Sequence, residues 1–199
     1  MEEDVKNAAE YPDSGTLRLH ARVPRSRANG PGLRAVIWLQ GCMLGCRECF
    51  NRDTWSRSGG QPVEGEALFR WLQAIEGIEG LSISGGEPTE QIGGLLPLLD
   101  RIRSHTSLSI LMFSGRTRAA IARLPGGPAL LDHLDVLVDG PYRASKRNPW
   151  GAWPSSSNQA IHLLSDRYRA DDFINLPQAE ITITADGTLV ETGVGAVMS

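Results

Sequence analysis

Apolar residues recur along the middle of the chain in short continuous runs, separated by stretches in which they have helical spacing. The runs at 35–39, 81–83, 108–113 and 134–138 are typical of strands that are buried on both faces of a sheet. The stretches 66–75, 92–102 and 117–124 between them are typical of amphipathic helices. This alternation predicts an α/β fold with a largely parallel core sheet. Because Pro97 lies inside the second stretch, that helix could instead begin there.

The two ends of the chain follow other patterns. Residues 1–15 are polar without periodicity, and the alternation at 17–23 predicts an edge strand before a loop rich in Arg, Asn, Gly and Pro. We therefore divide the chain into an N-terminal extension with an edge strand, residues 1–29, and a main domain, residues 30–199. Residues 159–164 predict one more strand. Alternating residues on both sides of Ala185-Asp186-Gly187 predict a C-terminal β-hairpin.

Composition narrows the class of protein. The chain has 199 residues, is 41% hydrophobic and carries a formal net charge of −3, which fits one domain and argues against a nucleic-acid binder that works by bulk charge. Its apolar runs are too short to span a bilayer, and the acidic start, residues 1–4, is unlike a signal peptide. Three cysteines cannot all pair, which suits a reducing compartment. We expect a soluble, cytoplasmic protein that binds neither membrane nor nucleic acid.

All the cysteines lie together, just after the first buried run. Cys42, Cys46 and Cys49 have the spacing C-x3-C-x2-C. Thiolates this close repel one another unless a cation or a cluster neutralises them. A zinc site normally takes four protein ligands, whereas three cysteines alone suit an iron–sulfur cluster that leaves one iron open. Zinc and inert buried thiols stay as alternatives.

This spacing resembles the signature of the radical S-adenosylmethionine (SAM) superfamily. The continuation Cys-Phe-Asn-Arg-Asp-Thr-Trp at 49–55 is similar to the cluster loop of glycyl-radical activating enzymes. Three further motifs resemble the branch that activates anaerobic ribonucleotide reductase. They are Gly-Pro-Gly-Leu-Arg at 30–34, Asp-Val-Leu-Val-Asp-Gly-Pro-Tyr at 135–142 and Ser-Ser-Asn-Gln at 156–159. The order of these motifs is more specific than any one of them.

The resemblance implies a fold and a site. The fold is an incomplete TIM-like barrel, since a full barrel needs about 250 residues. Cys42, Cys46 and Cys49 would ligate a [4Fe-4S] cluster, which cleaves SAM reductively to a 5′-deoxyadenosyl radical. The other site residues that it implies, all for SAM binding, are Phe50, Asn51, Ser84, Gly85, Gly86, Glu87, Ser114 and Asp139.

Several positions leave alternatives open. Glu48 stands where many superfamily members carry an aromatic residue that packs on adenine, and Phe50 could supply that apolar face instead. Asp139 could equally be an ordinary turn aspartate before Gly-Pro. Asn158 and Gln159 could line the substrate opening or cap a loop. Trp150 and Trp153 could dock a partner or cover the end of the barrel.

Three functional hypotheses follow. The first is an activase that forms a glycyl radical on a partner enzyme, an anaerobic ribonucleotide reductase, with electrons from flavodoxin or ferredoxin. The second is a radical SAM enzyme of the same fold that modifies a small molecule or peptide directly. The third is a metal-storage or scaffold module without enzyme activity.

Overall fold

The structure, a computed structural model, describes residues 15–149, 153–183 and 186–193. Its centre is a seven-stranded sheet with the strand order β3-β1-β2-β4-β5-β6-β7. The four strands β2, β4, β5 and β6 are parallel, whereas β1, β3 and β7 run antiparallel to their neighbours. The α/β class and the parallel core are therefore as predicted. The strands of this sheet are β1 (Thr16–Ser26), β2 (Arg34–Leu39), β3 (Gln61–Glu64), β4 (Gly80–Gly85), β5 (Ser109–Ser114), β6 (Val136–Asp139) and β7 (Ala160–Leu163).

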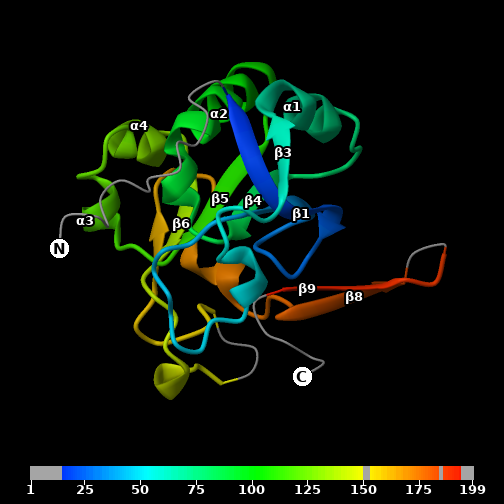
Figure 1. Cartoon of the computed structure of the whole chain (residues 1–199). Helices are drawn as coiled ribbons and strands as arrows, with labels where there is room; N and C mark the ends of the chain where they lie inside the picture. The colour runs from blue at the N-terminus through cyan, green and yellow to red at the C-terminus, as the bar shows by residue number, and fades with distance from the viewer. Residues whose placement is uncertain (1–14, 150–152, 184–185, 194–199) are drawn as a thin grey trace.

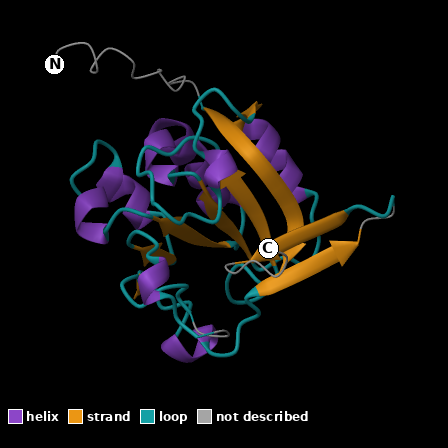
Figure 2. Cartoon of the chain, turned by 60° about the horizontal axis from the view of Figure 1, so that its bottom comes forward, coloured by secondary structure: helices purple, strands orange, loops and turns teal. Residues whose placement is uncertain are grey.

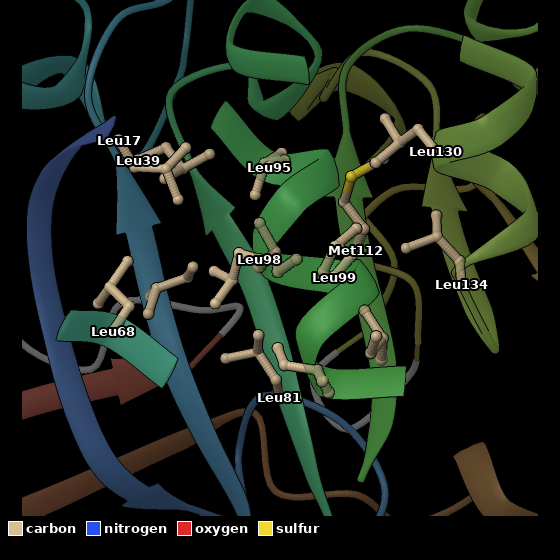
Figure 3. Packing of buried hydrophobic residues seen from close by; sticks show 14 of the residues in the cluster. Leu17, Leu39, Leu68, Leu81, Leu95, Leu98, Leu99, Met112, Leu130 and Leu134 are labelled. Carbon is tan, nitrogen blue, oxygen red and sulfur yellow. The ribbon is translucent and has the colours of Figure 1, made fainter. Parts of the chain in front are cut away.

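Helices cover one face of the sheet (Figures 1 and 2). Because side chains alternate along a strand, Ile37, Ile83 and Met112 point toward the helices, while their neighbours point away. Figure 3 shows Leu95, Leu98 and Leu99 of α2 packed toward these strands. The helices are α1 (Gly65–Gln73), α2 (Ile92–His105), α3 (Arg118–Ile121) and α4 (Gly127–Asp132), with 3-10 turns η1 (Arg52–Thr54), η2 (Pro88–Gln91), η3 (Ala144–Lys146) and η4 (Ala170–Phe173). In the described part of the chain, no helix has both the length and the apolar character that crossing a bilayer requires.

The opposite face of the sheet is covered in part by the chain that follows β6. Leu111, Val136 and Val138 form a second apolar cluster with Phe173 of η4. The ring of Trp153 joins this cluster, 5.7 Å from the ring of Phe113 and 6.2 Å from that of Phe173. Trp153 therefore covers this face of the sheet, while Trp150 lies outside the described residues.

A buried cation ties this covering segment to the sheet. The Arg34 side chain is completely buried and donates hydrogen bonds to Ser82 Oγ at 2.7 Å, Ser109 Oγ at 3.0 Å and Tyr168 Oη at 2.8 Å. Burial lowers the pKa of the Arg34 guanidinium, and Tyr168 opposes that shift. Since a buried charge is tolerated only when it is well hydrogen-bonded, the hydroxyl of Tyr168 belongs to the core of the fold.

The strand predicted at 17–23 is present as β1, but its expected edge position is wrong. β3 pairs outside it, with Thr16 opposite Glu64 and Leu19 opposite Gln61. The hydrophobic pattern does not predict β3, because this short strand contains only two apolar residues, Pro62 and Val63. Its edge position accommodates Pro62, which lacks an N–H to donate to a further strand.

The expectation that a helix could begin at Pro97 is also wrong. α2 begins at Ile92, directly after η2, and runs through Pro97 to His105. An internal proline removes one backbone hydrogen bond and crowds the preceding turn. The burial of Leu95, Leu98 and Leu99 around Pro97 offsets that cost.

The last two strands stand apart from the main sheet. β8 (Ala179–Ile183) and β9 (Leu189–Gly193) form an antiparallel pair, with Ala179 opposite Gly193 and Ile183 opposite Leu189. In Figure 1 this pair extends away from the body of the protein.

Candidate functional site

A cavity of about 450 Å³ lies where the parallel strands end. Parallel strands place their carboxyl ends at one edge, where α/β folds build binding sites. Trp38 of β2 and Ser84 of β4 line the cavity. Each follows a residue, Ile37 or Ile83, that points toward the helices. Because successive side chains of a strand point to opposite faces, the cavity lies on the face of the sheet away from α1 and α2. Its volume suits a small-molecule cofactor. The residues proposed from the sequence that line it are Cys42, Cys46, Cys49, Phe50, Asn51, Ser84, Gly85, Gly86, Glu87 and Ser114.

The cysteines lie on a loop after β2 that is closed at its base by the backbone. Gly41 N–H donates to Thr54 O at 2.6 Å, and Cys42 N–H donates to Trp55 O at 3.1 Å. The Gln40 side chain reinforces this closure, because its amide donates to Asp53 O at 3.0 Å and to a second carbonyl, Ser56 O, at 2.7 Å. The loop is thus held in place independently of its three thiols.

Backbone hydrogen bonds join the loop after β4 to the end of β2 and the start of the cysteine loop. Gly86 N–H donates to Leu39 O at 2.8 Å, and Glu87 N–H donates to Gly41 O at 2.8 Å. A Cβ added at Gly86 would collide with the Gly41 carbonyl, and one at Gly85 would collide with the backbone of Leu39. Glycine is required here because only bare backbone can approach so closely.

Replacing Gly86 with alanine is expected to displace the cysteine loop. The added methyl group meets a backbone carbonyl that cannot rotate away without breaking the Glu87–Gly41 hydrogen bond, so we expect a loss of about 1–3 kcal/mol in the free energy of unfolding. Bound iron after anaerobic reconstitution should fall together with stability.

The matched control is Gly77→Ala. Gly77 has a φ of +77° but open space around its Cβ position, so this change strains the backbone far from the loop and should leave bound iron unchanged. Equal iron content in the two variants would contradict a specific effect on the cysteine loop.

Glu87 is completely buried under the cavity. Its Oε1 accepts hydrogen bonds from Ser114 Oγ at 2.8 Å and Thr89 Oγ1 at 2.6 Å, and its Oε2 accepts one from Gly115 N–H at 2.9 Å. These donors fix the carboxylate between η2 and the end of β5. Because a carboxylate oxygen has two lone pairs, Oε2 retains capacity for one more donor.

The Cys42 and Cys46 thiols are partly buried in the cavity wall. Burial raises the pKa of the Cys42 thiol, against the lowering effect of the backbone amides of Leu44 and Gly45. Burial also raises the pKa of the Cys46 thiol, and Cys49 adds to the shift. A bound cationic centre would offset this effect of burial on Cys42 and Cys46.

Cys42, Cys46 and Cys49 line one cavity. Among the residues that the structure describes, no three His, Cys, Asp or Glu side chains converge closely enough to hold one metal ion. In an iron–sulfur cluster each thiolate binds a different iron, so three thiols spread around one cavity are a suitable donor set.

Asp139 is not brought into the cavity. It lies buried at the end of β6, where it accepts a hydrogen bond from the backbone N–H of Arg118. Its Oδ2 also lies 3.1 Å from Nε2 of His162 on β7. Asp139 therefore connects the start of α3 to the last strand of the sheet.

Tyr142 is a cavity residue that the sequence analysis did not select. Its ring centroid lies 4.5 Å from that of Phe50, so the two rings form an apolar wall beside the cysteines. Burial raises the pKa of the Tyr142 hydroxyl. The only signal in the sequence was its place at the end of the Asp135–Tyr142 motif.

Asn158 and Gln159 hold the loop that carries Tyr142. Asn158 Nδ2 donates to Pro141 O at 2.7 Å, and Gln159 Nε2 donates to Gly140 O at 3.2 Å. Gln159 also lines the cavity. Both residues therefore support a loop, and Gln159 in addition lines the cavity.

The cavity has two further walls that sequence reasoning missed. His20 and Val23 line it from β1, and the run 190–193 lines it from β9. His20 Nδ1 lies 3.1 Å from Gln40 Oε1. No local motif marks these positions, because they reach the site only through the pairing of distant strands.

Comparison with known proteins gives the family. The chain is 32% identical over 153 residues to the anaerobic ribonucleoside-triphosphate reductase-activating protein of Vibrio cholerae, covering 73% of this chain and 97% of the relative. The chain belongs to the family of anaerobic ribonucleoside-triphosphate reductase-activating proteins. The activating proteins of Escherichia coli K12 and of phage T4 are 29% and 28% identical, with 99% and 92% of their lengths covered.

The sequence model of the protein family described as a 4Fe-4S single cluster domain matches residues 28–162 of this activating protein. That range includes the cysteine loop, the glycine loop after β4 and Ser114. The resemblance to the radical SAM superfamily and to its activating branch is confirmed. A weaker structural likeness is that to QueE from Escherichia coli, with a TM-score of 0.44 and 19% identity over 51% of this chain and 53% of QueE.

Proposed function

We propose that this protein activates an anaerobic ribonucleotide reductase by forming a glycyl radical on it, with SAM as the radical source. The observation that carries the proposal is the single cavity in which the three thiols meet the glycine loop after β4, in a chain whose relatives are named as activating proteins of that reductase.

In this proposal Cys42, Cys46 and Cys49 hold a [4Fe-4S] cluster. When bound, the cluster would supply the electron that cleaves SAM to a 5′-deoxyadenosyl radical. The protein contributes the thiolates and the closed loop base that keeps them at one side of the cavity. The bare backbone at Gly85 and Gly86 lets the start of the cysteine loop pack directly against the end of β4.

The other cavity residues would bind SAM beside the thiols. The free acceptor position on Glu87 Oε2 suits an ammonium group, which carries only donors. The wall of Phe50 and Tyr142 offers adenine the apolar face that Glu48 does not. Ser114 fixes the Glu87 carboxylate. Asp139, which lies outside the cavity lining, would act only by positioning the start of α3.

The shape of the fold is consistent with a large substrate. The sheet has two edge strands, β3 and β7, that do not pair with each other. It would therefore be the incomplete barrel that the family resemblance implies. An open side admits a protein loop that carries the target glycine. The electrons would come from an outside donor, flavodoxin or ferredoxin, because the three cysteines of the chain are all in one loop.

The test is anaerobic activation of the ribonucleotide reductase from the same source. The reconstituted protein, SAM and a reductant are expected to give a glycyl-radical EPR signal on the reductase and about one 5′-deoxyadenosine per radical site. A protein that turns SAM over on a free small molecule or peptide, without a radical on the reductase, would contradict this function. If the protein binds metal but cleaves no SAM, it is a metal-binding module and not an activase.

A further inference from the structure

Cationic side chains gather on the two segments of chain that flank the Cys46 and Cys49 thiols. The cysteine loop carries two of them, and the segment after β6 carries three more, on and beside η3. All five are exposed to solvent; they are Arg47, Arg52, Arg143, Lys146 and Arg147. We call this set the cationic surface.

The two segments lie side by side. The ring centroids of Phe50 and Tyr142 are 4.5 Å apart, and in Figure 1 the cysteine loop (cyan) runs beside the chain after β6 (yellow-green). Burial raises the pKa of the Cys46 thiol, and the nearby backbone of Tyr142 opposes that shift. Arg143 is the next residue along the chain, so the cationic surface borders the thiols.

These cations have little negative charge around them to balance their own. Among the described residues, none of the five forms an ion pair with a carboxylate. The cysteine loop contains the acids Glu48 and Asp53, but the chain from 140 to 165 contains no Asp or Glu. The whole chain nevertheless has a formal net charge of −3. The surface beside the thiols is therefore rich in positive charge on a protein that is negative overall.

We propose that the cationic surface docks the electron donor, a small acidic electron-transfer protein, beside the thiols. This inference rests on the proposed function. A positive surface on a negative protein attracts an anionic partner to that one side and orients it. The partner gives one electron to the cluster and is itself oxidised by one electron, so its redox group must come close to the thiols. It must also dissociate afterwards, and exposed charges suit the weak, small interfaces of electron-transfer complexes.

The test compares the double variant Arg143→Glu/Arg147→Glu with the control Arg70→Glu/Arg123→Glu. Both variants change the net charge equally, and the control residues are exposed on α1 and after α3, outside the cavity lining. Calorimetry at low salt, with oxidised flavodoxin and in a parallel titration with oxidised ferredoxin, gives the Kd for the reconstituted protein. For at least one of these electron donors, the Kd in the first variant should rise by about tenfold or more. The control should match the wild type, and added salt should narrow the difference.

SAM cleavage driven by a small photochemical reductant, without a protein electron donor, should stay at the wild-type level in both variants. This shows that each variant is folded and holds its cluster. If the charge reversal disturbs the fold, Arg143→Gln/Arg147→Gln should give a smaller rise in Kd in the same direction.

Three outcomes would overturn the proposal. The first is an unchanged Kd for both electron donors in the surface variant, and the second is an equal rise in the control. The third is a rise in the reductase concentration that gives half-maximal glycyl-radical formation, with the Kd of both electron donors unchanged, which would assign the cationic surface to the reductase. If the wild type cleaves no SAM even with the small reductant, the proposed function itself fails and the docking role falls with it.

Discussion

Replacing Cys46 with serine is expected to abolish the brown iron–sulfur absorbance and to reduce SAM cleavage to background. Cys46 faces the cavity together with Cys42 and Cys49, and the chain has no other cysteine to substitute for it. Serine keeps the size of the side chain but replaces a soft thiolate with a hard, weakly acidic hydroxyl, which iron–sulfur clusters rarely accept. The measurements are the visible spectrum and 5′-deoxyadenosine formation after anaerobic reconstitution.

Met43→Ala is the matched control in the same loop. Met43 is 70% exposed, and its backbone N–H, which the substitution keeps, is the group that donates to Glu90 Oε1 at 2.7 Å. The control should retain both absorbance and cleavage. Cleavage retained in Cys46→Ser would remove Cys46 from the ligand set and with it the cluster assignment.

Replacing Asp135 with alanine is expected to destabilise the fold more than any other change considered. The carboxylate is 2% exposed and accepts from Arg103 Nη2 at 2.9 Å, Ile110 N–H at 2.8 Å and Ser165 Oγ at 2.6 Å. It therefore joins α2, β5 and the segment after β7. Removing one partner of such a buried network costs about 3–5 kcal/mol, which lowers Tm by roughly 10 °C in a chain of this size.

Asp100→Ala provides the comparison for this stability experiment. The side chain of Asp100 is 67% exposed, and its carboxylate lies 2.7 Å from His133 Nε2. An exposed pair of this kind contributes about 0–1 kcal/mol. Chemical and thermal denaturation of the two variants should therefore differ clearly. Similar stabilities would mean that the buried network around Asp135 contributes little.

The elements that the sequence predicted best are those whose signal is local. The apolar run at 35–39 is long enough to identify a strand buried on both faces, and the cysteines that follow it must then lie at the carboxyl edge of a parallel sheet. The resemblance selects Gly85 and Gly86 as site residues, and their lack of a side chain permits a close backbone approach. The structure identifies the neighbour as the start of the cysteine loop, at Leu39 and Gly41.

The features that the sequence did not predict depend on tertiary pairing. β3 is too short and too polar to show an alternation of apolar and polar residues. It forms a strand because it pairs with the edge of β1. The cavity walls from His20 and from β9 arise from strands far apart in the chain. Asp139 has the residue type and position of a site residue, but its orientation depends on His162 and on the backbone of Arg118.

The contact between Arg34 and Tyr168 sets a lower limit on the size of the folded unit. A chain that ended at residue 162, with the family domain, would lack both Tyr168 and Phe173. The guanidinium would then lose a hydroxyl acceptor, and Leu111, Val136 and Val138 would lose part of the apolar cover on that face of the sheet. Trimming the chain to residues 28–162 would therefore expose part of its own interior.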